Sequence, residues 1–354
     1  MKRTRQISSL QRRKQEHLLI ALEQDVEHIQ KTSFLEHVIL LHNALPEIDR
    51  DQVDISTDFL GHRFSAPILV SGMTGGSKEA ARINKNIAKA CQKLGLGMGL
   101  GSMKALIVEP SLSYSYQVRD VAPDIFLAGN IGANDLKNLS VDQLREALDR
   151  IGANILAVHL NPAQELVQAE GKAEFAGVLD MIDKYSAILP IYVKEVGQGI
   201  SFDVATRLSR TKIKAIDVAG AGGTNWIQIE YTRRGIENGP YKEWGIPTAL
   251  SLVWTRRATS LPIIASGGIR TGEDIVKSLV LGASIAGIGL PTLSHANIDS
   301  QSVEHAIEKL AREVGDVMFL IGKSSLSQLT PSSSIVTGKL REWLCDFTTP
   351  TQIE

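Results

Sequence analysis

The sequence has few cysteines, few aromatic residues and no excess charge of either sign. Cys91 and Cys345 are its two cysteines, and they make neither a disulfide framework nor a zinc-type spacing. The net charge of −1 offers no basic surface for nucleic acid or a membrane. No apolar run reaches the roughly 18 residues of a membrane span, and acidic residues soon follow the basic stretch Met1–Lys14, which argues against a signal or transit peptide. We therefore expect a cytoplasmic globular protein.

Short apolar runs recur from residue 67 onward and indicate strands. They are Pro67–Ser71, Leu96–Leu100, Ile125–Asn130, Ile155–His159, Ile191–Lys194, Ala215–Val218, Ile263–Ser266 and Ala283–Ile288. Each is almost wholly apolar rather than alternating, as a sheet covered on both faces requires. Helix-like segments separate most of them, including Ala80–Leu94, which ends at Gly95. Eight such units over about 250 residues predict an α/β fold, a (β/α)8 TIM barrel. A doubly wound open sheet is the alternative, although six strands would suffice for it.

The remaining segments flank the barrel or interrupt it. We assign residues 67–322 to the barrel, 1–66 to a helical N-terminal extension and 323–354 to a C-terminal helix and tail. Within the extension, Asp54–Phe64 could form a hairpin that plugs the bottom of the barrel. Gly220–Trp244 is a long insertion after the sixth strand, and long barrel loops of this kind usually serve function.

Polar residues crowd the end of the fourth predicted strand, in the run His159-Leu-Asn-Pro-Ala-Gln-Glu165. An unsatisfied buried polar group costs about 1–3 kcal/mol, so a cluster at the C-terminal end of a barrel strand usually faces a ligand. The alternative is a loop in which Asn161 and Gln164 only satisfy backbone groups.

Glycine-rich segments follow several other strands. Ser266–Thr271 and Ala286–Gly289 follow strands seven and eight, where barrels often bind phosphate through backbone N–H groups. Tight turns that need glycine are the alternative. Ser71–Gly76 could let a flat ring lie against backbone, and in Gly220–Trp226 the tryptophan could cover an apolar substrate or simply fill core.

Two cationic features complete the pattern. Lys194 ends an apolar strand, where its ammonium needs a partner, either a flavin ring or the carboxylate of a neighbouring glutamate. Near the N-terminus, Arg13 and His17 would share one helix face, and with Lys14 they suit a diphosphate. Without other information, a solvated tail is the simpler interpretation of these residues.

Together these motifs resemble those of the type 2 isopentenyl-diphosphate isomerases, flavoproteins that interconvert isopentenyl and dimethylallyl diphosphate in isoprenoid biosynthesis. The resemblance covers nearly everything from Arg13 to Pro291. It rests on the order of the strings Arg-Lys-x-Glu-His, Met-Thr-Gly-Gly, Gly-Ser-Met-Lys, His-Leu-Asn-Pro-x-Gln-Glu, Val-Lys-Glu-Val-Gly, Asp-Val-Ala-Gly-Ala-Gly-Gly-Thr-Asn-Trp, Trp-Gly-Ile-Pro-Thr-Ala and Ser-Gly-Gly-Ile-Arg.

The resemblance implies FMN, NADPH as its reductant, and Mg²⁺. FMN would be bound by Gly72, Met73, Thr74, Ser102, Asn130, Lys194, Thr224, Gly267, Gly268, Ile269, Arg270, Gly289 and Leu290. The prenyl diphosphate would be bound by Arg13, Lys14, His17, Ser102, Met103, Lys104, His159, Asn161 and Gln164. Gln164 and His159 would be catalytic, and Glu165 would ligate Mg²⁺, a hard cation that prefers oxygen ligands. A homotetramer or homo-octamer is also implied, in which the N-terminal arm serves its own or a neighbouring site.

The sequence departs from the family pattern at two places. Lys104 stands where many relatives have arginine, which keeps the charge but loses the guanidinium fork. Gly289-Leu290-Pro291 stands where Ala-Arg-Pro is common, and this changes the last phosphate loop.

The implied reaction moves a double bond without net oxidation, so one proton is delivered and another removed. The sequence offers no pair of carboxylates near the fourth loop, and we expect reduced FMN to act as the acid–base catalyst while Gln164 positions or relays a proton. A 2-hydroxy-acid oxidase would need a His-Gly-x-Arg setting, and an inosinate-type dehydrogenase would need a cysteine within Gly220–Trp226; the sequence has neither. A flavin sensor without activity would not need the His159–Glu165 run.

Overall fold

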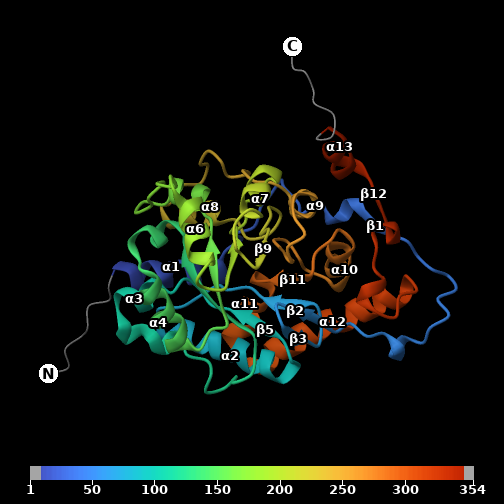
Figure 1. The fold of residues 1–354 in the computed structure, drawn as a ribbon, viewed down its shortest axis with the longest axis horizontal. Helices are drawn as coiled ribbons and strands as arrows, with labels where there is room; N and C mark the ends of the chain where they lie inside the picture. The colour runs from blue at the N-terminus through green and yellow to red at the C-terminus, as the bar shows by residue number, and fades with distance from the viewer. Residues whose placement is uncertain (1–8, 347–354) are drawn as a thin grey trace, which may run out of the picture.

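Eight parallel strands close into a barrel in the computed structural model, which describes residues 9–346 (Figure 1). The strands follow one another around the barrel in sequence order: β4 (Ile68–Val70), β5 (Gly97–Gly99), β6 (Leu127–Gly132), β7 (Ile155–His159), β8 (Ile191–Lys194), β9 (Ala215–Asp217), β10 (Ile263–Ser266) and β11 (Ile285–Ile288). β11 pairs with β4, which closes the ring. The predicted (β/α)8 barrel is therefore confirmed and the open sheet is excluded.

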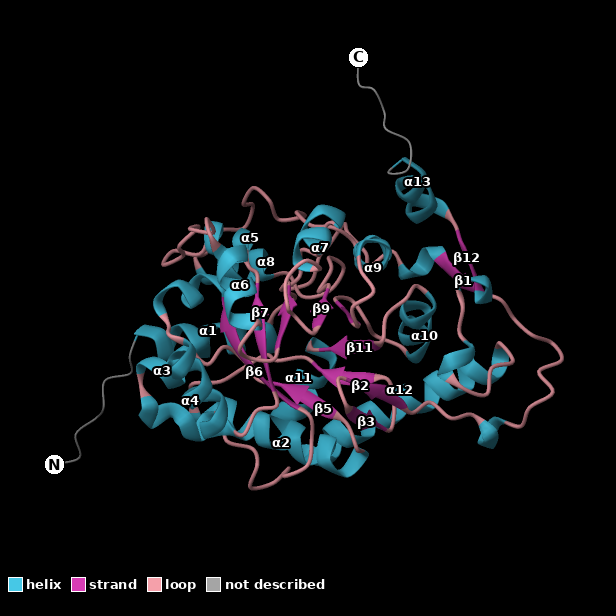
Figure 2. Ribbon diagram, viewed as in Figure 1, coloured by secondary structure: helices cyan, strands magenta, loops and turns pink. Residues whose placement is uncertain are grey.

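Helices surround the barrel (Figure 2). They are α2 (Lys78–Leu94), α3 (Lys104–Val108), α4 (Val141–Ile151), α5 (Pro162–Val167), α6 (Val178–Ser186), α7 (Phe202–Leu208), α8 (Trp226–Arg233), α9 (Thr248–Ala258), α10 (Gly272–Val280), α11 (Leu290–Ile298) and α12 (Ser300–Leu320). Ser140 and Gln143 form a capping box at the start of α4, and Gly95 ends α2 at φ 64°. Within residues 9–346, no helix combines the length and the apolar character needed to cross a bilayer.

The N-terminal extension is less helical than the sequence predicts. Its α-helix is α1 (Ser9–Glu23); the rest, as far as residue 66, holds only the 3-10 turns η1 (Leu35–His37) and η2 (Arg50–Gln52) and the strands β1 (Val38–Leu40), β2 (Thr57–Phe59) and β3 (His62–Phe64). β1 pairs antiparallel with β12 (Ser334–Val336), just before α13 (Gly338–Asp346). In Figure 1 this ribbon lies on the opposite side of the barrel from α1. The N-terminal extension and the segment that follows the barrel are thus joined by a sheet that local sequence patterns did not indicate.

The predicted hairpin forms from β2 and β3 and packs against the N-terminal ends of the barrel strands. Leu60 and Gly61 make its turn with φ 49° and 80°, the two positive values that a type I′ hairpin requires. Phe59 and Phe64 place their ring centroids 6.0 and 5.8 Å from that of Phe126, directly before β6. All three rings are buried. The apolar plug leaves the opposite, C-terminal end of the barrel as the open mouth.

Arg119 also closes the N-terminal end of the barrel, through several hydrogen bonds. Its guanidinium donates to the carbonyl oxygens of Gly152, Ala122, Pro123 and Ile125, at 2.7–3.2 Å. We expect Arg119→Ala to lower the free energy of unfolding by about 2 kcal/mol, because several carbonyls lose their donor at once. Urea denaturation measures this.

Arg145→Ala is the matched control for that prediction. Arg145 forms an ion pair with Asp142 on the exposed face of α4, so its loss should cost less than about 0.5 kcal/mol. Equal effects of the two substitutions would contradict the bracing role of Arg119.

Candidate active site

A cavity of ≈ 240 Å³ opens at the C-terminal mouth of the barrel. It is lined by the ends of the barrel strands, by α8 and α11, and by α1 lying across them. The lining residues are Lys14, His17, Leu18, Ala21, Ser71, Gly72, Met73, Thr74, Gly75, Gly101, Ser102, Asn130, His159, Gln164, Lys194, Val196, Gly197, Ala219, Thr224, Trp226, Ile229, Ser266, Gly267, Gly268, Ile269, Arg270, Gly287, Gly289, Leu290 and Leu293. Most of the residues proposed from the sequence are thus brought together in one cavity.

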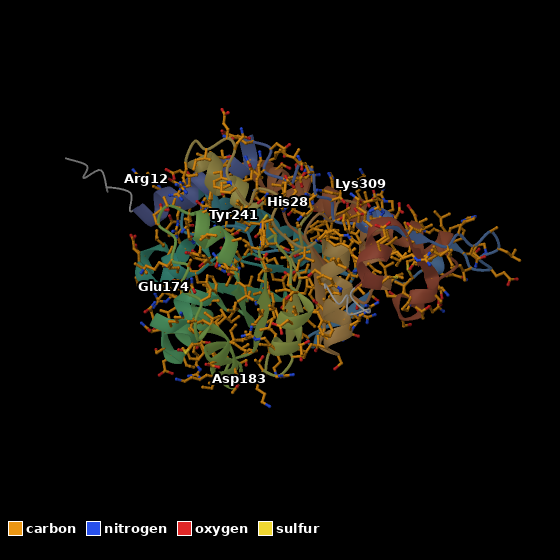
Figure 3. The ribbon with its side chains drawn as sticks, turned by 90° about the horizontal axis from the view of Figure 1, so that it is seen from above. Arg12, His28, Glu174, Asp183, Tyr241 and Lys309 are labelled. Atoms are coloured by element: carbon orange, nitrogen blue, oxygen red, sulfur yellow. The ribbon has the colours of Figure 1, made fainter. Side chains whose placement is uncertain are left out.

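The N-terminal arm, α1, lies over the mouth of its own barrel. Lys14 Nζ donates hydrogen bonds to Ser102 O at 2.6 Å and to the Tyr116 hydroxyl at 2.7 Å. His17 Nε2 lies 2.9 Å from Glu230 Oε1, and the His17 ring meets Trp226 edge-on. Figure 3, seen from above, labels Arg12 of α1 on the same side of the molecule as Tyr241 of the insertion. Within this chain, the arm contributes to its own cavity.

His159 is a neutral imidazole held by a strand neighbour. Its Nδ1 lies 2.8 Å from Asn130 Oδ1, at the end of β6. Burial, reinforced by the charges of Lys194, Lys14 and Lys104, lowers the pKa of His159 to about 3. Because Nδ1–H donates to the amide oxygen, Nε2 is left as a hydrogen-bond acceptor.

Gln164 is fixed by hydrogen bonds on both sides of its amide. Its Nε2 donates to Glu230 Oε1 at 3.1 Å, and its Oε1 accepts from Asn161 Nδ2 at 3.2 Å. Gln164 lines the cavity and is 8% exposed, so this side chain cannot rotate freely. Of the sequence cluster, His159 and Gln164 therefore line the cavity, so the cluster does more than satisfy the backbone of its own loop.

Glu230 lies at the centre of this hydrogen-bond network, and the sequence analysis did not identify it. It is fully buried, and Arg233 NH1 donates to its Oε2 at 2.8 Å. Burial would raise the pKa of Glu230, but His17, Gln164 and Arg233 outweigh it and hold the pKa below its usual value. The only signal in the sequence is the i,i+3 spacing of Glu230 and Arg233 on α8, which also occurs on many solvated helices.

The loops after β9 and β10 form a cradle that only glycine can build. Gly267 and Gly268 have φ 100° and 75°. A Cβ on Gly267 would lie 2.1 Å from Gly220 O, and one on Gly223 would lie 2.3 Å from Gly268 N. Backbone therefore packs on backbone here, and α10 and α11 begin close by.

Other groups at this cradle suit a phosphate and a flat ring. Among the described residues the buried hydroxyl of Ser71 has no hydrogen-bond partner, although it lines the cavity. The Arg270 guanidinium forms an ion pair with Glu27 at the same edge. A hydroxyl donor, a guanidinium and a glycine-rich loop that lines the cavity fit a flavin phosphate.

Lys194 lies at the end of β8 beside two buried carboxylates. Its Nζ donates to Glu195 O, a backbone carbonyl, at 2.5 Å, so the alternative of a pair with a glutamate carboxylate does not hold. The Glu195 carboxylate instead accepts N–H groups of Val196 and Gly197 at 2.6 and 2.7 Å. Asp217 Oδ1 accepts from the Ser266 hydroxyl at 2.6 Å. Lys194 lines the cavity while its ammonium keeps its hydrogen bond to Glu195 O.

Several proposed residues lie beside the cavity instead of lining it: Arg13, Met103, Lys104, Asn161 and Glu165. The Met103 side chain is fully buried against Gly129, and Lys104 Nζ lies 2.7 Å from Asp135 Oδ1. Glu165 accepts from Asn161 Nδ2 at 3.1 Å and from Lys172 N at 2.7 Å. Within residues 9–346, no group of three or more His, Cys, Asp or Glu side chains could hold a metal ion.

Comparison with known proteins identifies relatives of two kinds. The family model described as FMN-dependent dehydrogenase matches residues 8–113 and 165–336. The isopentenyl-diphosphate delta-isomerase of Pyrococcus abyssi is 44% identical over 349 residues, covering 94% of each chain. The enzyme of the same name from Methanosarcina barkeri is 40% identical and covers 96% of this chain and 95% of its own.

Solved structures agree on the fold. The flavin-binding domain of baker's yeast flavocytochrome b2 superposes with a TM-score of 0.66 at 20% identity, over 93% of this chain and 86% of that one. The stretch that the family model leaves unmatched, 114–164, contains Asn130, His159 and Gln164. The cradle thus lies within the part of the chain that the family model matches, whereas Asn130, His159 and Gln164 lie outside it.

Proposed function

Because the chain belongs to the isopentenyl-diphosphate delta-isomerase family of FMN-dependent barrel enzymes, we propose that it interconverts isopentenyl and dimethylallyl diphosphate. The observation that carries this proposal is the position of Gln164. Its immobilised amide lines the same cavity as the glycine cradle. The described lining residues include no Asp or Glu side chain, so a bound group would carry the acid–base chemistry.

FMN would lie across the mouth with its phosphate on the loops after β9, β10 and β11. Thr224, the Gly267–Arg270 loop and the Gly289–Leu290 turn would hold the phosphate. Gly72, Met73, Thr74, Ser102 and Asn130 would surround the ring, with Lys194 at its N1 side. When bound and reduced by NADPH, the flavin would supply the group that gives and takes the proton, and its electron-rich face would stabilise developing positive charge.

The substrate diphosphate would be met by the arm and by the loop after β5. Lys14, His17 and Ser102 line the cavity, whereas Arg13, Met103 and Lys104 lie next to it. The Lys104 ammonium is held by Asp135, so it would act as a point charge at the edge. These positive groups suit an anionic tail while Leu18, Ala21 and Trp226 offer apolar surface to a prenyl group.

Gln164 and His159 would orient the prenyl end of the substrate, where the double bond moves. An amide is too weak a base to remove an allylic proton, so Gln164 would position or relay a proton, with its Nε2–H held on Glu230. Neutral His159 would present Nε2 as an acceptor, and its ring is held by Asn130. These assignments rest on the family's motif together with the contacts described above.

Glu165 would hold Mg²⁺, which would neutralise charge on the diphosphate. A single carboxylate suits Mg²⁺ when phosphate oxygens and waters complete the octahedron. Glu165 is half-buried and already accepts hydrogen bonds from Asn161 and from Lys172 N, which orient it.

A homotetramer or homo-octamer is the assembly that we expect, and size-exclusion chromatography with light scattering measures it.

Substrate binding should weaken as the pH rises above neutrality. Burial, followed by the nearby Arg13, lowers the pKa of Lys14 to about 7. Below this pH the free enzyme offers a charged ammonium to the diphosphate; above it, binding must take up a proton, so KM should rise by up to about tenfold per pH unit. In Lys14→Arg the charge persists, and the rise should disappear. A profile of kcat and KM between pH 6 and 9 measures this, and an unchanged rise in Lys14→Arg would contradict the assignment to Lys14.

The decisive test of the function is proton exchange by the purified holoenzyme. We expect an absorbance spectrum of bound flavin, and deuterium uptake from deuterated water into isopentenyl diphosphate once NADPH and Mg²⁺ are present. EDTA or omission of the reductant should abolish uptake, while L-lactate should not bleach the flavin. A preparation that binds flavin and oxidises L-lactate, yet leaves the prenyl diphosphate unlabelled, would refute the proposal.

A further inference from the structure

Tyr116 is a buried residue behind the cavity, and sequence motifs did not single it out. It directly follows the 3-10 helix η3 (Pro110–Ser115) and is 0% exposed. Its ring packs against the loop after β4: a Cβ on Gly75 would lie 2.1 Å from Tyr116 Cε1. The ring therefore supports the backbone of the loop that we assign to the flavin.

The Tyr116 hydroxyl also binds the Lys14 ammonium. It accepts a hydrogen bond from Lys14 Nζ at 2.7 Å, and both groups donate to Ser102 O, at 2.7 and 2.6 Å. Burial raises the pKa of Tyr116, so the phenol keeps its proton and can donate and accept together. The Lys14 stem runs past Gly76, where a Cβ would lie 2.9 Å from Lys14 Cδ.

Buried neighbours hold this support in place. Asn84 Nδ2 donates to Thr74 O at 3.2 Å and to Ser115 O at 2.8 Å. The Ser115 hydroxyl accepts from Gly76 N at 2.8 Å. The loop after β4 and the Ser115–Tyr116 segment are therefore one hydrogen-bonded unit. Lys14 docks on this unit through the Tyr116 hydroxyl, and its second hydrogen bond goes to Ser102 O in the loop after β5.

We propose that Tyr116 is a positioning residue that docks the N-terminal arm, holding the Lys14 ammonium where the substrate diphosphate binds. It acts through Lys14 and does not itself line the cavity. Its ring supports the flavin loop and has its centroid 5.3 Å from Lys14 Nζ, whereas its hydroxyl supplies the hydrogen bond to the arm. The inference rests on the proposed function for its kinetic consequence, but the docking of the arm is independent of any reaction.

Tyr116→Phe separates the two roles, since it keeps the ring and removes the hydroxyl. We expect KM for isopentenyl diphosphate to rise about tenfold, the usual effect of losing one charge-assisted hydrogen bond, with kcat changed less than about twofold. FMN content should match that of the wild type. Tyr114→Phe is the matched control, because Tyr114 is 39% exposed in the same segment and should behave as wild type.

A double-mutant cycle tests whether the effect passes through Lys14. In Lys14→Ala, adding Tyr116→Phe should raise KM less than about twofold further. A second tenfold rise in that background, or a fall in kcat and FMN content with KM unchanged, would overturn the proposal.

Limited trypsin digestion of the FMN-loaded protein gives a readout without turnover. Cleavage at Arg12, Arg13 and Lys14 should be several-fold faster in Tyr116→Phe than in wild type or Tyr114→Phe. Equal cleavage rates in all three would overturn the docking role even if the enzyme isomerises its substrate. Faster cleavage in a protein inert toward prenyl diphosphates would instead retain the docking role and refute the proposed function.

Discussion

Gln164→Ala is expected to lower kcat about 100-fold while the protein keeps its FMN. The substitution removes an amide whose two ends are fixed by Glu230 and Asn161 at 3.1 and 3.2 Å. A positioned proton-transfer group typically contributes 10²–10⁴-fold, and an amide that orients or relays should lie near the lower limit. Stopped assays with reduced enzyme at saturating isopentenyl diphosphate measure kcat, and the flavin absorbance measures retention.

Gln301→Ala provides the control, because Gln301 is exposed on α12 and lies outside the cavity. The same side chain is removed there, and kcat should not change. If Gln164→Ala with reduced FMN turned over at the wild-type rate, the amide would have no part in the reaction. Gln164→Glu cannot replace Gln164→Ala in this test, because it adds a charge beside the buried Glu230 carboxylate.

The barrel was predictable because each of its strands carries its own signal. A strand covered on both faces is almost wholly apolar, and all residues of β8 and β10 are buried, with a polar residue only at the end that faces the cavity. Caps such as Ser140 and Thr271 are likewise local, because the capping side chain and the N–H group it satisfies lie within one turn. The hairpin of β2 and β3 is a third local feature.

The missed features depend on segments that are far apart in the sequence. β1 and β12 pair although about 300 residues separate them, and three-residue strands have no pattern of their own. Glu230 and Tyr116 become important only because α1 folds back over the mouth and brings His17 and Lys14 to them. Motifs identified which residues contact ligands, but not the buried residues that hold those side chains.

Gly267→Ala is expected to abolish stable FMN binding, weakening it at least about 100-fold, and to destabilise the fold by a few kcal/mol. A Cβ here would lie 2.1 Å from Gly220 O, a backbone atom that cannot rotate away. The residue also has φ 100°, a conformation that costs a non-glycine residue about 1–3 kcal/mol. The loops after β9 and β10 would have to separate, which removes the N–H groups from the phosphate. Flavin fluorescence titration of the apoprotein and thermal unfolding measure the two effects.

Gly61→Ala separates conformational strain from the steric clash. Gly61 has φ 80°, also positive, but a Cβ there would meet nothing within 4 Å. It lies in the hairpin turn at the closed end of the barrel, so the substitution should cost about 1–2 kcal/mol of stability and leave FMN affinity unchanged. If both variants bound FMN as the wild type does, close packing of the two loops would not be what forms the phosphate site. If both lost FMN, general destabilisation would explain the loss, and the cradle would have no specific role.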